Sequence, residues 1–153
     1  MNIFRCDPCP VLSACALADR HVVKMALESA QMLSTITGGP YRPTHIRHPA
    51  TLWAGASRVN ATWLLTHGIA LCDEYTRRFG KVHACASVLT KIDLSGLPDR
   101  DGTPPVYCGP DDVAGDTVEA RYRGLLARKY LVWGAMARWT RAERPGWSIG
   151  ATC

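Results

Sequence analysis

The hydrophobic positions of this chain first repeat at helical spacing over residues 10–37. His21, Lys24, Glu28 and Gln31 follow one another at spacings of three, four and three residues, so they form a polar stripe along such a helix. The apolar residues on the adjacent side are Ala18, Val22, Met25, Ala26, Met32, Leu33 and Ile36. A Gly-Gly-Pro run after residue 37 predicts the end of this amphipathic helix.

A second helical pattern runs over residues 49–79. Pro49 suits the first position of a helix, and Gly80 is a typical residue just beyond the last position. Gly55 and the Ser57-Arg58 step mark the place where this helix would divide in two.

The second half of the chain begins with a short helical pattern over residues 83–92. Residues 94–115 are rich in Pro and Gly and predict a long loop, which in a compact domain is usually functional or mobile. A capping-box pattern at Asp116-Thr117-Val118-Glu119 opens a last helix that is expected to run to about Trp139. We predict a tail over 140–153 that is irregular and aromatic.

No segment shows the alternation of a strand. We therefore predict an all-α fold over residues 1–153: one compact helical bundle with three main helices, the long loop and the irregular tail. A chain of 153 residues and 16.7 kDa can bury about 68–70% of its unfolded surface in one core. Its 47% hydrophobic and 20% charged residues exclude a disordered or collagen-like chain.

Cysteine usage and the chain start indicate the compartment. Seven cysteines, a start unlike a secretory signal and no apolar run of membrane-spanning length predict a cytoplasmic protein with reduced thiols and no membrane contact.

The positive charge is the most informative part of the composition. The chain has 18 Lys and Arg residues against 13 Asp and Glu, a net charge of +5, and fourteen of the cations are Arg. Residues 1–91 carry ten cations and five acids, residues 93–119 seven acids and one cation, and residues 121–153 seven cations and one acid. Two basic regions around an acidic segment suit a polyanion that contacts both ends of the chain. The alternative is a solvated surface with chance asymmetry.

The polar stripe is the first candidate site. His21, Lys24 and Glu28 place an imidazole, an amine and a carboxylate within two helical turns, a set that supports proton transfer and, if Lys24 is desolvated, imine formation. The alternative is a Lys–Glu ion pair between neighbouring turns beside a hydrogen-bonded histidine.

The histidines and the aromatic tail are the other candidates. His45 and His48 could share a metal ion with His83 or Glu28, but no acidic ligand adjoins them, so phosphate contacts or hydrogen bonds are favoured. We predict no metal and no cofactor.

The tail interleaves Trp with Arg, which suits stacking on bases and contact with phosphate, although two of its tryptophans could be core residues. These residues are Trp133, Trp139, Trp147, Arg138, Arg141 and Arg144.

Residues 17–21, Leu-Ala-Asp-Arg-His, with Glu28 seven residues after the histidine, resemble the catalytic helix of phage endonuclease V, the pyrimidine-dimer DNA glycosylase family. Residues 144–147 resemble the start of that family's aromatic C-terminal segment, and residues 48–80 its middle helix. The chain is also similar to small phage-encoded relatives. The residues shared with them are Met1-Asn2-Ile3-Phe4, His21-Val22-Val23-Lys24-Met25 with Glu28, Pro43-Thr44-His45 with His48-Pro49, and Gly80-Lys81 with His83.

The resemblance implies a small all-α DNA N-glycosylase with lyase activity that flips a base from duplex DNA. It gives Glu28 the role of the catalytic carboxylate and His21 that of a DNA contact or proton relay. The family's nucleophile is the amine of a small residue exposed by removal of the initiator Met. Here Asn2 predicts that Met1 is retained, so the amine would belong to Met1, the nucleophile could shift to Lys24, or no covalent step occurs.

Leu27 and Gln31 stand where the family has arginines, which predicts a changed target, either a damaged or a modified pyrimidine. We expect a monomer bound to double-stranded DNA in the cytoplasm, the host's if the chain is phage-encoded. The alternatives are a non-catalytic DNA-binding protein of the same fold, and a nucleotide or modified-base transferase or hydrolase that uses the histidines. The expected DNA contacts are Arg20, Gln31, Arg42, His45, Arg47, His48, Asn60, Lys81, His83, Arg144 and Trp147.

Overall fold

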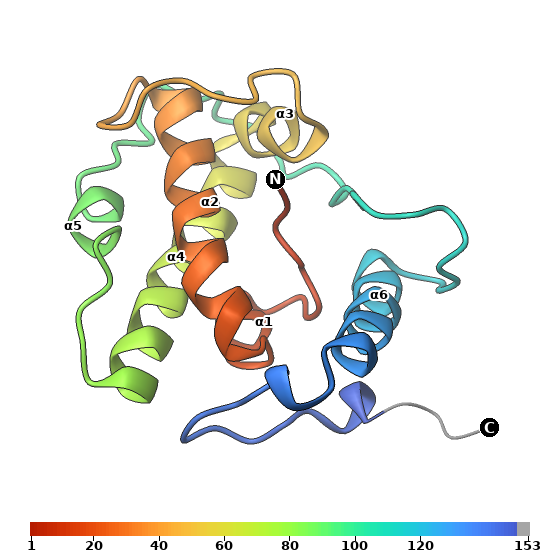
Figure 1. Cartoon of the computed structure of the whole chain (residues 1–153). Coiled ribbons are helices and arrows are strands. Elements are labelled where there is room, and N and C mark those ends of the chain that lie inside the picture. Colours follow the sequence, from red (N-terminus) through yellow and green to blue (C-terminus); the bar gives the residue numbers. More distant parts are fainter. Residues whose placement is uncertain (150–153) are drawn as a thin grey trace.

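The computed structural model describes residues 1–149, which form helices and loops without a strand (Figure 1). The all-α fold is therefore confirmed, with α2, α4 and α6 as the three main helices. Residues 150–153 of the predicted tail lie outside the described residues. The α-helices are α1 (Pro10–Cys15), α2 (Asp19–Thr37), α3 (Pro49–Ala56), α4 (Arg58–Phe79), α5 (Ala86–Leu89) and α6 (Val118–Trp133), and 3₁₀ turns follow at Gly134–Met136 and Gly146–Ser148.

The core lies between α2 and α4, which run side by side (Figure 1). The predicted apolar face of α2 is buried except at Ile36, which is partly buried, and Leu64 and Leu71 of α4 are buried as well. The two helices approach closely at Gly68, where a Cβ would lie 3.0 Å from the Cβ of Ser29 and 3.2 Å from Leu89 of α5. A Cβ at this crossing would require the Ser29 or Leu89 side chain to shift by a few tenths of an ångström, so glycine allows the closest packing here.

The N-terminal segment runs between α2 and α6 (Figure 1). Ile3 and Phe4 are buried in the core, and α6 covers them with the buried rings of Tyr122 and Tyr130. This arrangement brings the first residues of the chain beside the polar stripe of α2.

The helix expected over residues 10–37 is divided at residues 16–18, which is a correction to the sequence prediction. Three consecutive carbonyl groups at the break accept hydrogen bonds from side chains instead of continuing the helical ladder. Arg78 donates to the carbonyls of Cys15 over 2.9 Å and of Leu17 over 2.8 Å, and Trp139 donates to that of Ala16 over 3.1 Å. Because both donors come from distant parts of the chain, local periodicity carries no sign of the break.

Other boundaries follow local chemistry. The predicted division of the second helix is confirmed, because Ser57 is extended (φ −155°) and its hydroxyl accepts the N–H of Asn60 at the start of α4. The last helix ends at Trp133 instead of Trp139, since Gly134 has φ +51°. The short helix expected over 83–92 is confined to Ala86–Leu89, and the long loop is confirmed as irregular.

A buried ion network holds the break between α1 and α2. The Arg78 guanidinium lies 3.0 Å from Asp19 and 2.8 Å from Glu74, and its side chain is fully buried. Burial acts to raise the pKa of Glu74, but hydrogen bonds and charge from Arg77 and Arg78 outweigh it and hold that pKa below its usual value.

Within residues 1–149, no helix has the length and apolar character needed to cross a membrane.

Candidate functional site between α2, α6 and the N-terminus

The polar stripe of α2 opens into a cavity of about 380 Å³, whose other walls are the N-terminal segment and α6. A volume in this range can hold a nucleoside-sized group. Six of the predicted site residues line it together: Met1, Asn2, Arg20, His21, Lys24 and Glu28. The cavity is also lined by Phe4, Met25 and Lys129, which were not among the predicted site residues, and by Trp133, which was predicted only as one of the aromatic and basic residues near the C-terminus.

Glu28 is the acidic centre of the cavity, and its side chain is only 9% exposed. One carboxylate oxygen, Oε2, accepts the backbone N–H of Asn2 over 2.6 Å and lies 3.9 Å from the amine nitrogen of Met1. The other, Oε1, lies 3.5 Å from Nζ of Lys24, whose side chain is 68% exposed. The Lys–Glu pair between neighbouring turns is therefore present, and it forms part of a larger cluster of nitrogens around one carboxylate.

The N-terminal segment is held so that its nitrogens face Glu28. The Asn2 side chain donates from Nδ2 to the carbonyl of Cys108 over 2.7 Å, and its Oδ1 accepts the N–H of Ile3 over 2.8 Å. The Met1 side chain is only 2% exposed, and its sulfur lies 3.8 Å from the Thr51 hydroxyl. Met1 is thus anchored by its side chain while its amine faces the cavity.

His21 is buried and uncharged. Its Nδ1 lies 2.9 Å from the hydroxyl oxygen of Tyr130, which also accepts the N–H of Ala18 over 3.1 Å. Since Nδ1 is the acceptor within reach of the phenol proton, we assign the ring proton to Nε2. Burial, followed by the charges of Lys129 and Lys24, lowers the pKa of His21 to about 3.

An aromatic cluster forms one wall of the cavity. The His21 ring lies 4.6 Å from that of Phe4 and 4.8 Å from that of Trp133. The Arg20 guanidinium and the Lys129 ammonium lie 5.6 Å and 5.8 Å from the Trp133 ring centre, within range of cation–π attraction. Lys129 and Trp133 are one helical turn apart on α6, but the sequence does not show that this side of α6 faces α2.

The segment over residues 41–48 lies beside this cavity. A second cavity of about 700 Å³ is lined by Leu27 and Gln31 of α2 together with Tyr41, Arg42, Pro43 and Thr44. His48 caps α3, since its Nδ1 accepts the N–H of Ala50 over 3.2 Å. Burial and then the charge of the N-terminal amine lower the pKa of His48. Gln31 and Arg42 therefore line the neighbouring cavity, and the charges of the N-terminal amine, His45 and Glu28 act on His48. Arg47 is exposed on the same segment.

Other predicted contacts lie elsewhere in the fold. Asn60 is buried, and its amide is fully used inside the chain: Nδ2 donates to Trp53 and Thr103, and Oδ1 accepts the N–H of Thr103. It ties the long loop to α4. Arg144 donates to Ser148, and Trp147 stacks on Tyr130 with ring centres 6.4 Å apart.

Lys81 and His83 follow the C-terminal end of α4. His83 Nε2 lies 3.1 Å from the carbonyl oxygen of Val23, and His83 does not line the cavity. It is also not grouped with His45 and His48: in the part of the chain that the structure describes, no set of three or more His, Cys, Asp or Glu side chains is arranged to hold a metal ion.

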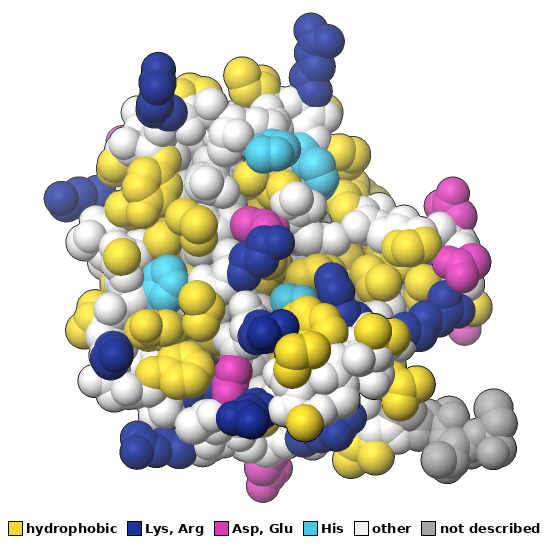
Figure 2. Space-filling model, viewed as in Figure 1, with side chains coloured by type: hydrophobic (Ala, Val, Ile, Leu, Met, Phe, Trp, Pro, Cys, Tyr) yellow, Lys and Arg dark blue, Asp and Glu magenta, His cyan; other side chains and the backbone are white. Residues whose placement is uncertain are grey.

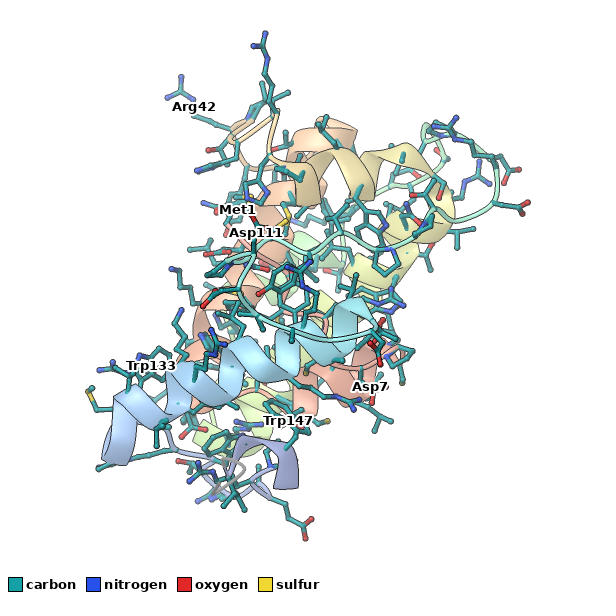
Figure 3. All side chains as sticks on the ribbon, turned by 90° about the vertical axis from the view of Figure 1, so that its right-hand side faces the viewer. Met1, Asp7, Arg42, Asp111, Trp133 and Trp147 are labelled. Carbon is teal, nitrogen blue, oxygen red and sulfur yellow. The ribbon has the colours of Figure 1, made fainter. Side chains whose placement is uncertain are left out.

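The face that carries the cavity is basic. Figure 2 shows Lys and Arg side chains from its upper to its lower edge. The acidic side chains of the long loop partly neutralise α6, since Asp112 lies 2.8 Å from Arg128 and Asp111 lies 4.0 Å from Arg121. In the turned view, Arg42, Met1 and Trp133 follow one another along a single edge of the molecule (Figure 3).

A comparison with family models decides the family. Residues 1–87 match the model of the pyrimidine dimer DNA glycosylases, which covers more than half of the chain. The chain belongs to the pyrimidine dimer DNA glycosylase family. No curated protein and no solved structure matches the chain.

The family match covers some of the residues that line the cavity and leaves out others. Met1, Asn2, His21, Lys24 and Glu28 lie inside the region shared with the glycosylase family, whereas all of α6 lies outside it. Of the aromatic and basic wall of the cavity, Lys129 and Trp133 are therefore supplied by a part of this glycosylase-family chain that the family model does not cover, whereas Phe4, Arg20 and His21 lie within the match.

Proposed function

We propose that this protein is a DNA glycosylase that excises a damaged or modified pyrimidine from duplex DNA, with an AP-lyase step through an imine. The observation that carries the proposal is the position of Glu28. Its carboxylate lies 3.9 Å from the amine of Met1 and 2.6 Å from the nitrogen of Asn2, inside a cavity on a basic face. Family membership supports the same activity.

The chemistry requires an amine and a carboxylate near the same sugar carbon. The amine lone pair forms a bond to C1′ of the extruded nucleotide, and the N-glycosidic bond breaks with its electron pair leaving on the base, which takes up a proton. Glu28 stabilises the positive charge that develops on the sugar and accepts the proton released by the attacking nitrogen. Opening of the sugar ring then gives an imine, from which strand cleavage by β-elimination can follow.

The nucleophile is the chain's terminal amine in this proposal: that of Met1, or that of Asn2 where Met1 is removed. An α-amine ordinarily titrates near pH 8, about two units below a lysine, so more of it is unprotonated at neutral pH. Lys24 would need desolvation to become a nucleophile, but its side chain is 68% exposed. Lys24 instead adds positive charge beside the carboxylate.

His21 acts in this proposal as a neutral hydrogen-bond donor. With Nδ1 used by Tyr130 and a pKa of about 3, the ring cannot carry a second proton near neutral pH. Its Nε2–H is available for a base or phosphate oxygen. Arg20, Arg42 and Arg47 supply phosphate contacts on the surrounding face, and duplex DNA is the partner.

The test is incubation with a duplex that contains a cyclobutane thymine dimer, in parallel with uracil and modified-pyrimidine duplexes, with and without borohydride. We expect cleavage of the glycosidic bond, read as strand scission at the target, and a trapped covalent adduct whose peptide mass assigns the amine. A uracil or modified pyrimidine would be released as the free base, whereas the detached thymine of a dimer stays bonded to its neighbour through the cyclobutane ring. Glu28→Gln should lower single-turnover cleavage by about 10²–10⁴-fold with duplex affinity retained. Glu143→Gln, in the tail, is the matched control and should cleave normally.

Two outcomes separate the alternatives. Cleavage without a trapped adduct would remove the imine step and leave the glycosylase. Tight duplex binding with no cleavage of any of these substrates, and no effect of Glu28→Gln, would replace the enzyme with a DNA-binding protein of the same fold.

A further inference from the structure

The side chains that line the Glu28 cavity offer donors to an incoming group, and their acceptors are already used. Among the described lining residues, side-chain oxygens belong to Asn2 and Glu28. Oδ1 of Asn2 accepts the N–H of Ile3 over 2.8 Å and that of Phe4 over 3.2 Å. Oε2 of Glu28 accepts the N–H of Asn2 over 2.6 Å, and Oε1 lies 3.5 Å from Nζ of Lys24. A base that enters the cavity therefore meets free side-chain donors instead of free side-chain acceptors.

The donor of His21 is fixed by its neighbour on α6. The Tyr130 hydroxyl accepts the N–H of Ala18 over 3.1 Å, so its own proton is directed to Nδ1 of His21, 2.9 Å away. Burial raises the pKa of Tyr130 and keeps that proton in place. The ring proton of His21 is then on Nε2, for which residues 1–149 supply no hydrogen-bond partner. Because His21 is only 3% exposed and lines the cavity, this N–H can find an acceptor only there.

The aromatic side chains of the cavity gather at its His21 end. The ring centre of His21 lies 4.6 Å from that of Phe4 and 4.8 Å from that of Trp133. At the other end, the Glu28 carboxylate faces the N-terminal amine. Aromatic surfaces bind flat bases, whereas the proposed attack on the sugar requires the amine and the carboxylate. We therefore expect the base of an extruded nucleotide at the His21 end and its sugar at the Glu28 end.

The spacing of the two ends matches one pyrimidine nucleotide. His21 and Glu28 are seven residues apart on α2, which corresponds to about 10 Å along the helix axis. With the sugar C1′ at Glu28, position 4 is the part of the pyrimidine ring farthest from the sugar. A pyrimidine ring with a contact of about 3 Å at each end covers a similar length. Nε2 of His21 is therefore placed to contact the substituent at position 4.

We propose that His21 selects target pyrimidines with a carbonyl oxygen at position 4, as in thymine, uracil and their 5-substituted forms, over those with an amino group there, as in cytosine and its derivatives. This inference rests on the proposed function and names the substrate class of that site. The Nε2–H donates to a 4-carbonyl, whereas a 4-amino group would bring its own N–H groups against a donor and leave them unpaired in the cavity. Tyr130 is a positioning residue, because it keeps the proton on Nε2 without touching the target.

The experiment uses two pairs of duplexes whose members differ in whether position 4 of the target carries a carbonyl or an amino group. One pair holds a cyclobutane dimer of thymine or of 5-methylcytosine, and the other holds 5-hydroxymethyluracil or 5-hydroxymethylcytosine. Each target is placed opposite abasic residues, so that no difference in base pairing enters the comparison. Single-turnover cleavage is read as strand scission after alkali. We expect the unaltered full chain to cleave the 4-carbonyl member about 10- to 100-fold faster than the 4-amino member.

Two variants test whether His21 is the origin of the preference. His21→Phe keeps an aromatic ring beside Phe4 and Trp133 but removes the donor, and Tyr130→Phe frees the ring proton to move to Nδ1. Both should reduce the preference to about threefold or less, while duplex affinity changes by about threefold or less because phosphate contacts dominate it. Tyr75→Phe removes a phenol that does not line the cavity, and it should keep the full preference. Thermal unfolding checks that each variant folds.

The outcomes separate this inference from the proposed function. Equal cleavage of both members, or a preference that both variants retain, overturns the selection and leaves the glycosylase. Equal slowing of both members by His21→Phe, with the preference unchanged, assigns the Nε2–H to a phosphate oxygen and also overturns the selection. If no duplex is cleaved, binding decides: tighter binding of the 4-carbonyl member that depends on His21 supports the selection and removes the enzyme, whereas equal binding of both members overturns both proposals.

Discussion

Tyr130 and His21 are joined by a 2.9 Å hydrogen bond between the phenol oxygen and Nδ1, across 109 residues of chain. His21 lies in the region that matches the glycosylase family, and Tyr130 lies outside it on α6. The imidazole of the cavity is therefore hydrogen-bonded to a helix that the family model does not cover. Residues 1–87 contain the candidate catalytic side chains but lack the partner that orients one of them.

Tyr130→Phe should lower the free energy of unfolding by about 1–3 kcal/mol, because it leaves the buried N–H of Ala18 and Nδ1 of His21 without a partner. Urea denaturation measures this change, and ¹⁵N chemical shifts of the imidazole should show that the Nε2–H form is no longer dominant. Tyr75→Phe is the control, with an expected change within about 0.5 kcal/mol. Equal losses in the two variants would contradict the role assigned to Tyr130.

Lys24→Met should retain the borohydride adduct. Its ammonium is exposed to water and pairs with Glu28, so removal takes away charge but not the proposed nucleophile. Cleavage should fall by about tenfold or less, in keeping with the loss of one exposed ion pair. Adduct yield on gels is the measurement, with Lys91→Met as the control. Loss of the adduct with unchanged duplex binding would transfer the nucleophile to Lys24.

Stability should fall as the pH is lowered from about 6.5 to about 4. Burial lowers the pKa of His21 to about 3 and that of His67 to about 4, from an ordinary 6.5. Below pH 6.5 both histidines bind a proton in the unfolded chain but stay neutral in the folded chain. The free energy of unfolding should therefore decrease by about 1.4 kcal/mol per pH unit for each of the two histidines. Above pH 6.5 this contribution should vanish.

Urea denaturation across this pH range gives the slope. His21→Gln should remove about half of it, whereas His45→Gln, at an exposed position, should leave it unchanged. A slope that is the same in all three proteins would show that other groups govern the acid transition.

Arg78→Met should destabilise the fold by about 3–5 kcal/mol, because it leaves the carboxylates of Asp19 and Glu74 and the carbonyls at the α1–α2 break without their donor. The adjacent Arg77 also bonds Glu74 but is half-exposed, so Arg77→Met should cost about 1 kcal/mol or less. Chemical denaturation of the pair is a matched comparison. Similar losses would mean that burial of the ion network adds nothing.

The sequence was most informative where all the residues that determine a feature lie on one helix. Lys24 and Glu28 could be placed together because both lie on α2 at helical spacing, and the division at Ser57 could be predicted because the side chain caps its own helix. The break at residues 16–18 could not, since its cause is Arg78, some 60 residues further on.

The same limit applies to the site. Asn60 shares a helical spacing with other polar residues of α4, but its burial against Thr103 depends on where the long loop returns. Lys129 and Trp133 face the cavity because of how α6 is rotated against α2, and rotation of that kind is a property of the tertiary packing. Trp147, which is predicted to contact DNA, stacks on Tyr130 in the fold, and the sequence carries no sign of that packing.

The break between α1 and α2 also has a mechanical meaning. Its carbonyls accept hydrogen bonds from Arg78 and Trp139, and the Asp19 carboxylate accepts hydrogen bonds from Arg78 and Thr140. These bonds connect α1, α2, α4 and the C-terminal segment at one place. The helix that carries Glu28 begins at these contacts, which restrict its movement relative to the rest of the fold. In the proposed complex with duplex DNA, we therefore expect the nucleic acid, rather than α2, to change shape.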